Sequence, residues 1–445
     1  MKISFLDDEP EIFPMQYGGK ARTIINLAKT FSKLPGISKV SILSRSIKSN
    51  KAEFVWNGVN FKKLLGYGMM RSVIEEVSGC DILNIHACSF TFPYIGGKGA
   101  RLVYHLHDVI FATSDSGSHL DKAMGNKWSA IISPSEFATK TLSNISWWSN
   151  IKDRIYTIPR GVDFKMFFPV NEKKINKRFA KFKNNFPILL FPNRYAANKG
   201  ESFLFNLVEE LKKKYPNVLI LTTNNIDEKS GGVIQNIGWV ASEDMRYYYS
   251  LSDIVLNLSV APESFSQVAI ESVACRTPVV CFRFGNLKDL SERIPSIKSC
   301  EPTKRELLNT INLILEGGLN GEAEMNQSSD IVKKEYDLNN ACKSYLAHYK
   351  KILKLKEKSF VMTMGPEMRK ERFAVSPLIA VYDNNVYLSN ENDLAKIAIT
   401  EFEKRVLAYC SVVKTKKEII TEFEKVDELE NILNKLVNKS ILIKV

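Results

Sequence analysis

Two successive series of short apolar segments, alternating with helical patterns, constrain the fold of this chain more than any other feature. The first series opens with an apolar strand at residues 3–6, and a helix pattern with apolar spacing follows through residue 31. Strands that alternate with helices form parallel sheets with helices on both faces. We expect the other strands of this sheet at residues 40–43, 81–85, 102–105 and 130–132.

The second series follows a Lys-rich polar stretch at residues 171–185. Two such units enclose a cleft, and ligands bind at the carboxyl ends of the strands. We therefore expect an α/β protein in which two Rossmann-like domains, residues 1–165 and 166–355, face a cleft. The second domain should contain strands at residues 188–191, 218–222, 254–258 and 279–282, and helices at 202–213 and 242–251.

Residues 360–445 show a third, smaller pattern. A hairpin is expected at residues 372–390, turning at Asp383, Asn384 and Asn385, and three helices at 400–411, 415–424 and 427–439 precede an apolar strand at 441–445. This order predicts a small α+β winged-helix-like module. Such modules bind peptides, nucleic acids or other protein domains, and a role in dimerisation or stability is equally open. The nearly balanced charge of this segment makes nucleic acid the least favoured partner.

Composition bounds the partners and the compartment. The chain has 445 residues and a net charge of +13, and more than half of the positive excess lies in residues 1–165. A basic face attracts anionic lipid, a phosphorylated acceptor or nucleic acid, although a generally Lys-rich surface explains the excess as well. The seven cysteines form no ligand-spaced cluster, and the acidic N-terminus lacks the features of a signal peptide. We expect a cytoplasmic protein and leave peripheral contact with the inner membrane face open.

The strongest chemical signal lies around residues 263–271. An apolar strand ends near residue 258, a polar loop carries Glu263, and a helix begins near Ser266. The free N–H groups of Ser266, Gln267 and Val268 would then present the positive end of a helix dipole to a diphosphate. Further along the helix, Glu271 could hold a ribose diol through paired hydrogen bonds.

This stretch resembles the E-x7-E signature of the retaining family 4 glycosyltransferases, which have the GT-B fold. The flanking pattern also agrees, with Phe265 after the first glutamate and Thr-Pro-Val-Val at residues 277–280. Two residues depart from the family pattern, because Ser266 and Arg276 each replace a usual glycine. A bulkier loop at these positions is expected to alter the donor sugar preference or, at the extreme, to abolish catalysis.

The resemblance extends to the N-terminal domain. Gly18 and Gly19 match the family's glycine loop, which approaches the donor phosphate or the acceptor, and glycine allows a close backbone approach to a ligand. His107 and Asp108 follow a predicted strand, as the family's histidine does. The resemblance implies that His107 contacts the donor sugar and that Asp108 orients His107.

Cationic and aromatic residues of the second domain complete the implied donor site. Arg194 and Lys199 match the family's phosphate-binding R-x4-K-G pattern, and two fixed cations would offset the charge of a departing nucleoside diphosphate. Trp239 and Val240 resemble the segment beside the nucleotide base, although Trp239 could equally belong to the core. Glu263 would orient the hydroxyls of the sugar.

The implied function is transfer of a sugar from a nucleoside-diphosphate sugar with retention at the anomeric carbon, without a metal or another cofactor. Residues 1–165 would be the acceptor domain and residues 166–355 the nucleotide-sugar domain. A cell-surface or lipid-linked glycan is the favoured acceptor, and a peptide, a protein or a natural product recognised through the C-terminal module is the alternative. A sugar-nucleotide epimerase, a phosphorylase and a non-catalytic binding protein of the same fold are further alternatives.

Overall fold

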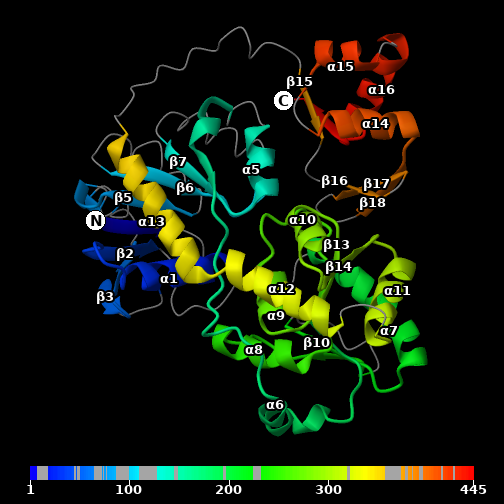
Figure 1. Ribbon diagram of the computed structural model, residues 1–445, viewed down its shortest axis with the longest axis horizontal. Coiled ribbons are helices and arrows are strands. Elements are labelled where there is room, and N and C mark those ends of the chain that lie inside the picture. Colours follow the sequence, from blue (N-terminus) through cyan, green and yellow to red (C-terminus); the bar gives the residue numbers. More distant parts are fainter. Residues whose placement is uncertain are drawn as a thin grey trace. The chain divides into compact units, whose positions relative to one another are not determined.

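The computed structural model forms two compact units (Figure 1). The first contains residues 1–163 and 336–368, and the second contains residues 164–335 and 369–445. The structure describes residues 1–7, 19–44, 47, 51–64, 73, 75–76, 78–86, 100–109, 128–144, 149–193, 197–223, 232–317, 321–355, 372–375, 379–382, 384–389, 394–411, 414–423 and 426–444.

The first unit is built on an eight-stranded sheet with the order β3-β4-β2-β1-β5-β6-β7-β8. Neighbouring strands are parallel except β3 and β4. The five strands predicted for this sheet are confirmed. The strands are β1 (Lys2–Asp7), β2 (Lys39–Ser44), β3 (Glu53–Trp56), β4 (Val59–Lys63), β5 (Ile82–Ile85), β6 (Arg101–His105), β7 (Trp128–Ser133) and β8 (Ile155–Thr157).

Helices cover both faces of this sheet. Helices α1 (Gly19–Phe31) and α13 (Leu338–Lys354) share a core with one face, and α5 (Glu136–Ser143) packs on the other. The chain returns to this unit through paired backbones, since the Val162 N–H donates to the Tyr336 carbonyl at 2.7 Å. Residues 336–355 thus belong to the first unit, whereas the sequence placed them with the second.

The second unit contains a six-stranded parallel sheet with the order β11-β10-β9-β12-β13-β14. Its four predicted strands and its two predicted helices, α7 and α8, are confirmed. The strands are β9 (Ile188–Phe191), β10 (Leu219–Thr222), β11 (Ile234–Asn236), β12 (Ile254–Asn257), β13 (Val279–Phe282) and β14 (Ile297–Cys300). The helices are α6 (Glu172–Arg178), α7 (Glu201–Lys214), α8 (Ser242–Leu251), α9 (Gln267–Ala274), α10 (Asn286–Arg293), α11 (Lys304–Leu315) and α12 (Glu322–Glu335).

The C-terminal module, residues 372–444, has two small sheets and three helices. The three predicted helices are confirmed. A hairpin turns where predicted, since Tyr382 pairs with Asn385, but it spans only residues 379–389, because residues 372–375 pair with residues 414–415 and 442–444 instead. A third strand, β18, extends the hairpin and was not predicted. The winged-helix assignment itself stays a prediction. The elements are β15 (Arg372–Val375), β16 (Ile379–Tyr382), β17 (Asn385–Ser389), β18 (Leu394–Ala398), α14 (Glu401–Tyr409), β19 (Lys414–Thr415), α15 (Lys416–Phe423), α16 (Val426–Asn438) and β20 (Leu442–Lys444).

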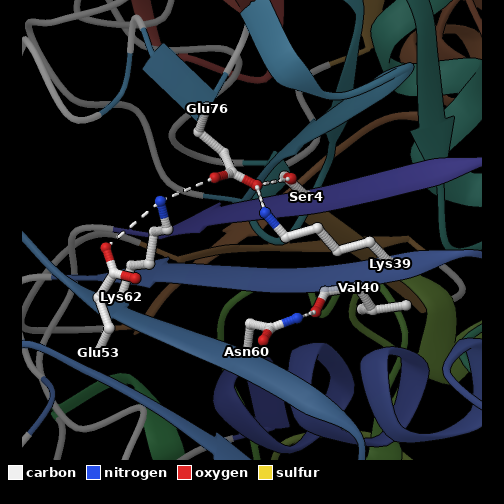
Figure 2. Close-up of polar contacts among 7 residues, drawn as sticks. All are labelled: Ser4, Lys39, Val40, Glu53, Asn60, Lys62 and Glu76. Carbon is white, nitrogen blue, oxygen red and sulfur yellow. Dashed lines mark hydrogen bonds and ion pairs between the residues drawn. The ribbon is translucent and has the colours of Figure 1, made fainter.

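A buried carboxylate ties several strands of the first sheet together (Figure 2). Glu76 is 5% exposed and accepts a hydrogen bond of 2.7 Å from the Ser4 hydroxyl of β1. Its two oxygens also pair with Lys39 of β2 at 3.6 Å and with Lys62 of β4 at 3.2 Å. Burial raises the pKa of the Glu76 carboxyl, but the hydroxyl and lysine partners outweigh burial and hold this pKa below its usual range.

Candidate functional site

The loop that follows β12 brings the predicted Glu263 and Lys199 together. β12 ends at Asn257, and the chain then crosses the carboxyl end of the sheet before α9 begins at Gln267. Glu263 Oε1 lies 2.7 Å from Lys199 Nζ, which comes from the short helical turn after β9. A cation and a carboxylate are thus held side by side where parallel sheets bind ligands.

Ser266 connects this pair to the sheet. Asn257 Nδ2 donates to the Ser266 hydroxyl at 2.7 Å. Burial raises the pKa of the Glu263 carboxyl, but the neighbouring Lys199, Ser266 and Asn257 side chains outweigh burial and hold this pKa below its usual range. Glu263 is therefore an anion at neutral pH, suited to accept hydrogen bonds from sugar hydroxyls.

Several buried polar atoms around this loop lack a protein partner among the described residues. They are Asn193 Nδ2, Asn198 Oδ1, Asn257 Oδ1 and Gln267 Oε1. Buried polar groups are almost always hydrogen-bonded in proteins, so a cluster of such atoms marks a place where a ligand completes the bonding. These atoms come from the loop after β9, from the last residue of β12 and from the start of α9. The free amides in the first turn of α9 therefore belong to the same polar site.

The backbone of the loop is clamped by residues 285–286. Asn286 N–H donates to the Glu263 carbonyl at 2.8 Å, and Asn286 Nδ2 donates to the Phe265 carbonyl at 2.7 Å. Gly285 has φ +61°, and a Cβ atom there would lie 2.6 Å from the Glu263 backbone. Only glycine permits this approach, so the Glu263 backbone is held on both sides.

Glu271 is positioned differently from the other predicted residues. Its side chain is completely buried, and the Tyr249 hydroxyl of α8 donates to its Oε2 at 3.1 Å. The predicted contact with a ribose would require a neighbouring side chain to move aside. The structure does not place Glu271 on an accessible surface.

Trp239 and Val240 follow β11, at the edge of the second sheet. The Trp239 ring is 50% exposed, which excludes the alternative that it belongs to the core. A tight turn precedes it, since the Gly238 N–H donates to Asn236 Oδ1 at 2.7 Å. An exposed indole offers an apolar face for stacking, as the prediction for a nucleotide base requires.

Three histidines cluster at the carboxyl ends of β5 and β6 in the first unit. His86 Nδ1 lies 2.8 Å from His107 Nε2, and the His86 and His105 rings stack with centroids 4.1 Å apart. His105 Nε2 lies 2.8 Å from Asn84 Oδ1, which also accepts from the Tyr349 hydroxyl of α13. The predicted His107 is therefore one member of a packed aromatic group.

Burial keeps these imidazoles neutral. It lowers the pKa of His107 well below its usual value, and the Arg160 guanidinium and the other two rings lower it further. Burial likewise depresses the pKa of His86, and it brings the pKa of His105 to about 3. A neutral imidazole both donates and accepts a hydrogen bond, so His107 suits a sugar hydroxyl better than a phosphate.

The remaining predicted residues of this unit lie nearby in the sequence. Asp108 is exposed, and Gly19 is the first residue of α1. Lys20 in the first turn of α1 pairs with the buried Asp7, the last residue of β1, at 2.9 Å. This pair was not predicted, although its position after the first strand was a signal that sequence reasoning could have used.

One segment of the second unit matches a known protein family. Residues 186–310 match the family described as glycosyl transferases group 1. We call this matched segment the group 1 domain. The mannosylfructose-phosphate synthase of Agrobacterium fabrum is 28% identical over 155 residues, which are 31% of this chain and 34% of that protein. The D-inositol 3-phosphate glycosyltransferase of Pseudarthrobacter chlorophenolicus is 29% identical over 151 residues, 30% of this chain and 35% of that protein.

The match to these curated relatives thus spans about a third of their length. Solved structures agree with a larger part of the fold. Sucrose-phosphate synthase from Thermosynechococcus elongatus superposes with a TM-score of 0.66 at 16% identity, covering 79% of this chain and 98% of that one. Anabaena Alr3699/HepE in complex with UDP-glucose gives 0.62 at 18% identity, covering 79% and 100%. Together with the two Rossmann-like sheets, this likeness establishes the GT-B type of fold.

Most of the predicted donor residues lie in the group 1 domain. Two of the predicted donor residues are not among the residues that the structure describes. Lys199, Glu263 and Ser266 come together, joined by Asn257, which sequence reasoning missed. Gly18 and Arg194 lie outside the described residues. Gln267 and Val268 begin α9, as predicted, and Gln267 contributes one of the buried polar atoms without a partner.

The described residues contain neither a metal-binding group of side chains nor a helix that could span a membrane. No group of three His, Cys, Asp or Glu side chains there could hold a metal ion, and metal independence remains a prediction. None of the helices within these ranges combines the length and the apolar character that a bilayer crossing requires.

Proposed function

We propose that this chain transfers a sugar from a nucleoside-diphosphate sugar to an acceptor, with retention at the anomeric carbon. The observation that carries the proposal is the Lys199–Glu263 pair within the group 1 domain, surrounded by buried polar atoms that have no partner among the described residues. A diphosphate needs cations and amide donors, and a sugar needs a fixed acceptor for its hydroxyls. Lys199 and the first turn of α9 would serve the diphosphate, and Glu263 would serve the sugar.

The residues support a division of labour in the reaction. The Lys199 ammonium has three protons, so it can hold Glu263 and a phosphate oxygen together. With the first turn of α9, it would stabilise the negative charge that develops as the bond from the anomeric carbon to the diphosphate breaks. The acceptor oxygen forms the new bond on the same face, and its proton passes to the departing diphosphate. Glu263 and the neutral His107 would orient the sugar hydroxyls.

Uridine is the nucleotide we propose first, because a structural relative was solved with UDP-glucose. The acceptor we propose carries a phosphate, as a lipid-linked glycan does. The names of the related synthase and inositol-phosphate glycosyltransferase also refer to phosphorylated compounds. The excess of Lys and Arg over Asp and Glu in residues 1–165 favours an anionic acceptor.

A peptide acceptor is the second candidate. The C-terminal module shares a core with the group 1 domain, since Ala380 and Tyr387 are buried together with residues of the second sheet. A peptide bound by this module would therefore be recognised by the donor-binding unit itself. Stimulation of donor turnover by peptides, and not by phosphorylated sugars or lipid-linked phosphates, would favour this candidate.

The test uses two lysines of the second unit that each pair with a glutamate. Lys199→Met should lower the turnover of the preferred donor by about a hundredfold, since a preorganised charge at a departing group contributes roughly that much. Lys298, which pairs with Glu324 at 2.9 Å, is the matched control, and Lys298→Met should leave turnover within about twofold. Donor hydrolysis is measured with UDP-, GDP-, ADP- and TDP-sugars. Equal activity of the two variants, or no binding of any nucleotide sugar by the wild type, would contradict the proposal.

A further inference from the structure

The sheet β16–β18 is shared between two hydrophobic cores. One face carries Ala380 and Tyr387, which are buried with Phe282 of β13 and Cys300 of β14. The other face carries Ile379 and Val386, which are buried with helices α14, α15 and α16. The module is therefore continuous with the group 1 domain.

Tyr382, the last residue of β16, fastens two strand ends of the group 1 domain. Its hydroxyl accepts a hydrogen bond of 2.7 Å from the N–H of Arg283, which follows β13. The same hydroxyl donates to the carbonyl of Cys300, the last residue of β14. Burial raises the pKa of the Tyr382 phenol far above its usual value, so the phenol keeps the proton that it donates.

Arg283 lies at one end of a short segment whose other end holds the Glu263 loop. Phe284 is fully buried, and Gly285 lies against the Glu263 backbone with no room for a Cβ atom. Asn286 donates to the carbonyl of Glu263. Only two residues, Phe284 and Gly285, thus separate the amide bound by Tyr382 from the amide that holds Glu263. A segment this short and this closely packed transmits a displacement instead of absorbing it.

We propose that Tyr382 is a positioning residue for Glu263, acting through residues 283–286. The C-terminal module is then a working part of the donor site and sets the orientation of the carboxylate that holds the sugar. This inference rests on the proposed donor site, so the experiment includes a measurement that needs no donor.

Tyr387 provides the matched control in the full-length protein. It lies on the same sheet face, and its hydroxyl donates to Glu301, beyond the end of β14, where it has no bond to the 283–286 segment. Tyr382→Phe and Tyr387→Phe each remove one hydroxyl between the module and the domain. Only the first removes the partner of the Arg283 amide.

Hydrogen exchange without donor gives the first readout. Tyr382→Phe should accelerate exchange of the amides of residues 283–286 and 263–266 by about tenfold, the effect of losing one hydrogen bond in the native state. Tyr387→Phe should change these segments by less than about twofold. Equal acceleration in both variants would mean general loosening of the module and would overturn the inference.

Donor discrimination gives the second readout, because a ratio does not depend on the folded fraction. The ratio of kcat/KM for the preferred donor to that for its C4 epimer should fall about fivefold in Tyr382→Phe and stay constant in Tyr387→Phe. If Tyr382→Phe exchanges faster but the wild type binds no nucleotide sugar, the proposed function is contradicted and the coupling through residues 283–286 is supported. If Tyr382→Phe shows both an unchanged kcat/KM ratio and normal hydrogen exchange, only the coupling of Tyr382 to Glu263 is contradicted.

A third measurement decides the matter even if Tyr382→Phe does not fold. In the wild type, the amides of Arg283 and Asn286 should exchange in one kinetic class and respond together to low concentrations of urea. Independent opening of these two amides would show that the segment does not transmit displacement, and it would overturn the inference.

Discussion

The two residues that depart from the family's glycines keep the backbone conformation of a glycine. Ser266 has φ +66° and Arg276 has φ +64°, in the left-handed region that L residues avoid. The sequence showed that these side chains are unusual, but it could not show that the chain would accept the strain. Their surroundings differ, because Ser266 is buried and bonded to Asn257, whereas Arg276 reaches Asn326 and Glu322 at the surface.

Replacing each of the two by glycine should therefore have opposite effects on stability. Arg276→Gly relieves strain and loses only surface contacts, so the free energy of unfolding should rise by about 1 kcal/mol. Ser266→Gly relieves similar strain but leaves the buried Asn257 amide without its acceptor, at a cost of about 1–3 kcal/mol, so the free energy of unfolding should fall. Urea unfolding of both variants checks the signs. A stabilised Ser266→Gly protein would show that the hydroxyl contributes little.

The central strands could be predicted from the sequence, and most edge strands could not. β1 and β9 have side chains buried on both faces, which produces the continuous apolar runs that mark such strands. β3 and β11 have no fully buried side chain, and their sequences carry no comparable signal. The same reason limits the site, because Glu263 stands in a recognisable pattern, while Asn257 matters only through contacts that the fold creates.

The Glu76 network shows how one helical position stabilises several strands. Glu76→Gln should lower the free energy of unfolding by about 3 kcal/mol, because Lys39 and Lys62 would lose the buried charge that they share. Glu53 also pairs with Lys62, at 3.4 Å, but its side chain is 67% exposed. Glu53→Gln should therefore change the stability by less than about 0.5 kcal/mol. Urea titrations of both variants at low and high salt measure the difference. Similar losses in the two variants would show that the burial of Glu76 is not what matters.

On the scale of the whole molecule, the five histidines are distributed very unevenly. His86 and His105 are buried and form one cluster with the half-buried His107; His119 and His348 are the others, and residues 164–335 and 369–445 contain none. Buried histidines with lowered pKa values favour the unfolded chain in acid, because the unfolded imidazole takes up a proton below about pH 6.5 and the folded one does not. Acid should therefore destabilise the first unit selectively.

The stability of the first unit should be fully present above pH 6.5 and should fall as the pH drops toward the folded pKa values, of which that of His105 is about 3. Each imidazole contributes about 1.4 kcal/mol per pH unit as long as the pH stays above its folded pKa, so the three together contribute at most about 4 kcal/mol per pH unit. Hydrogen exchange at pH 6.5 and 5.0, corrected for the intrinsic rate, should show β5 and β6 losing protection while β9 and β12 keep theirs. His105→Phe retains an aromatic ring against His86 but cannot take up a proton, so it should remove about a third of the loss. Equal losses of protection in both units would instead attribute the acid sensitivity to Asp and Glu carboxylates, which both units contain. The histidine cluster would then not explain it.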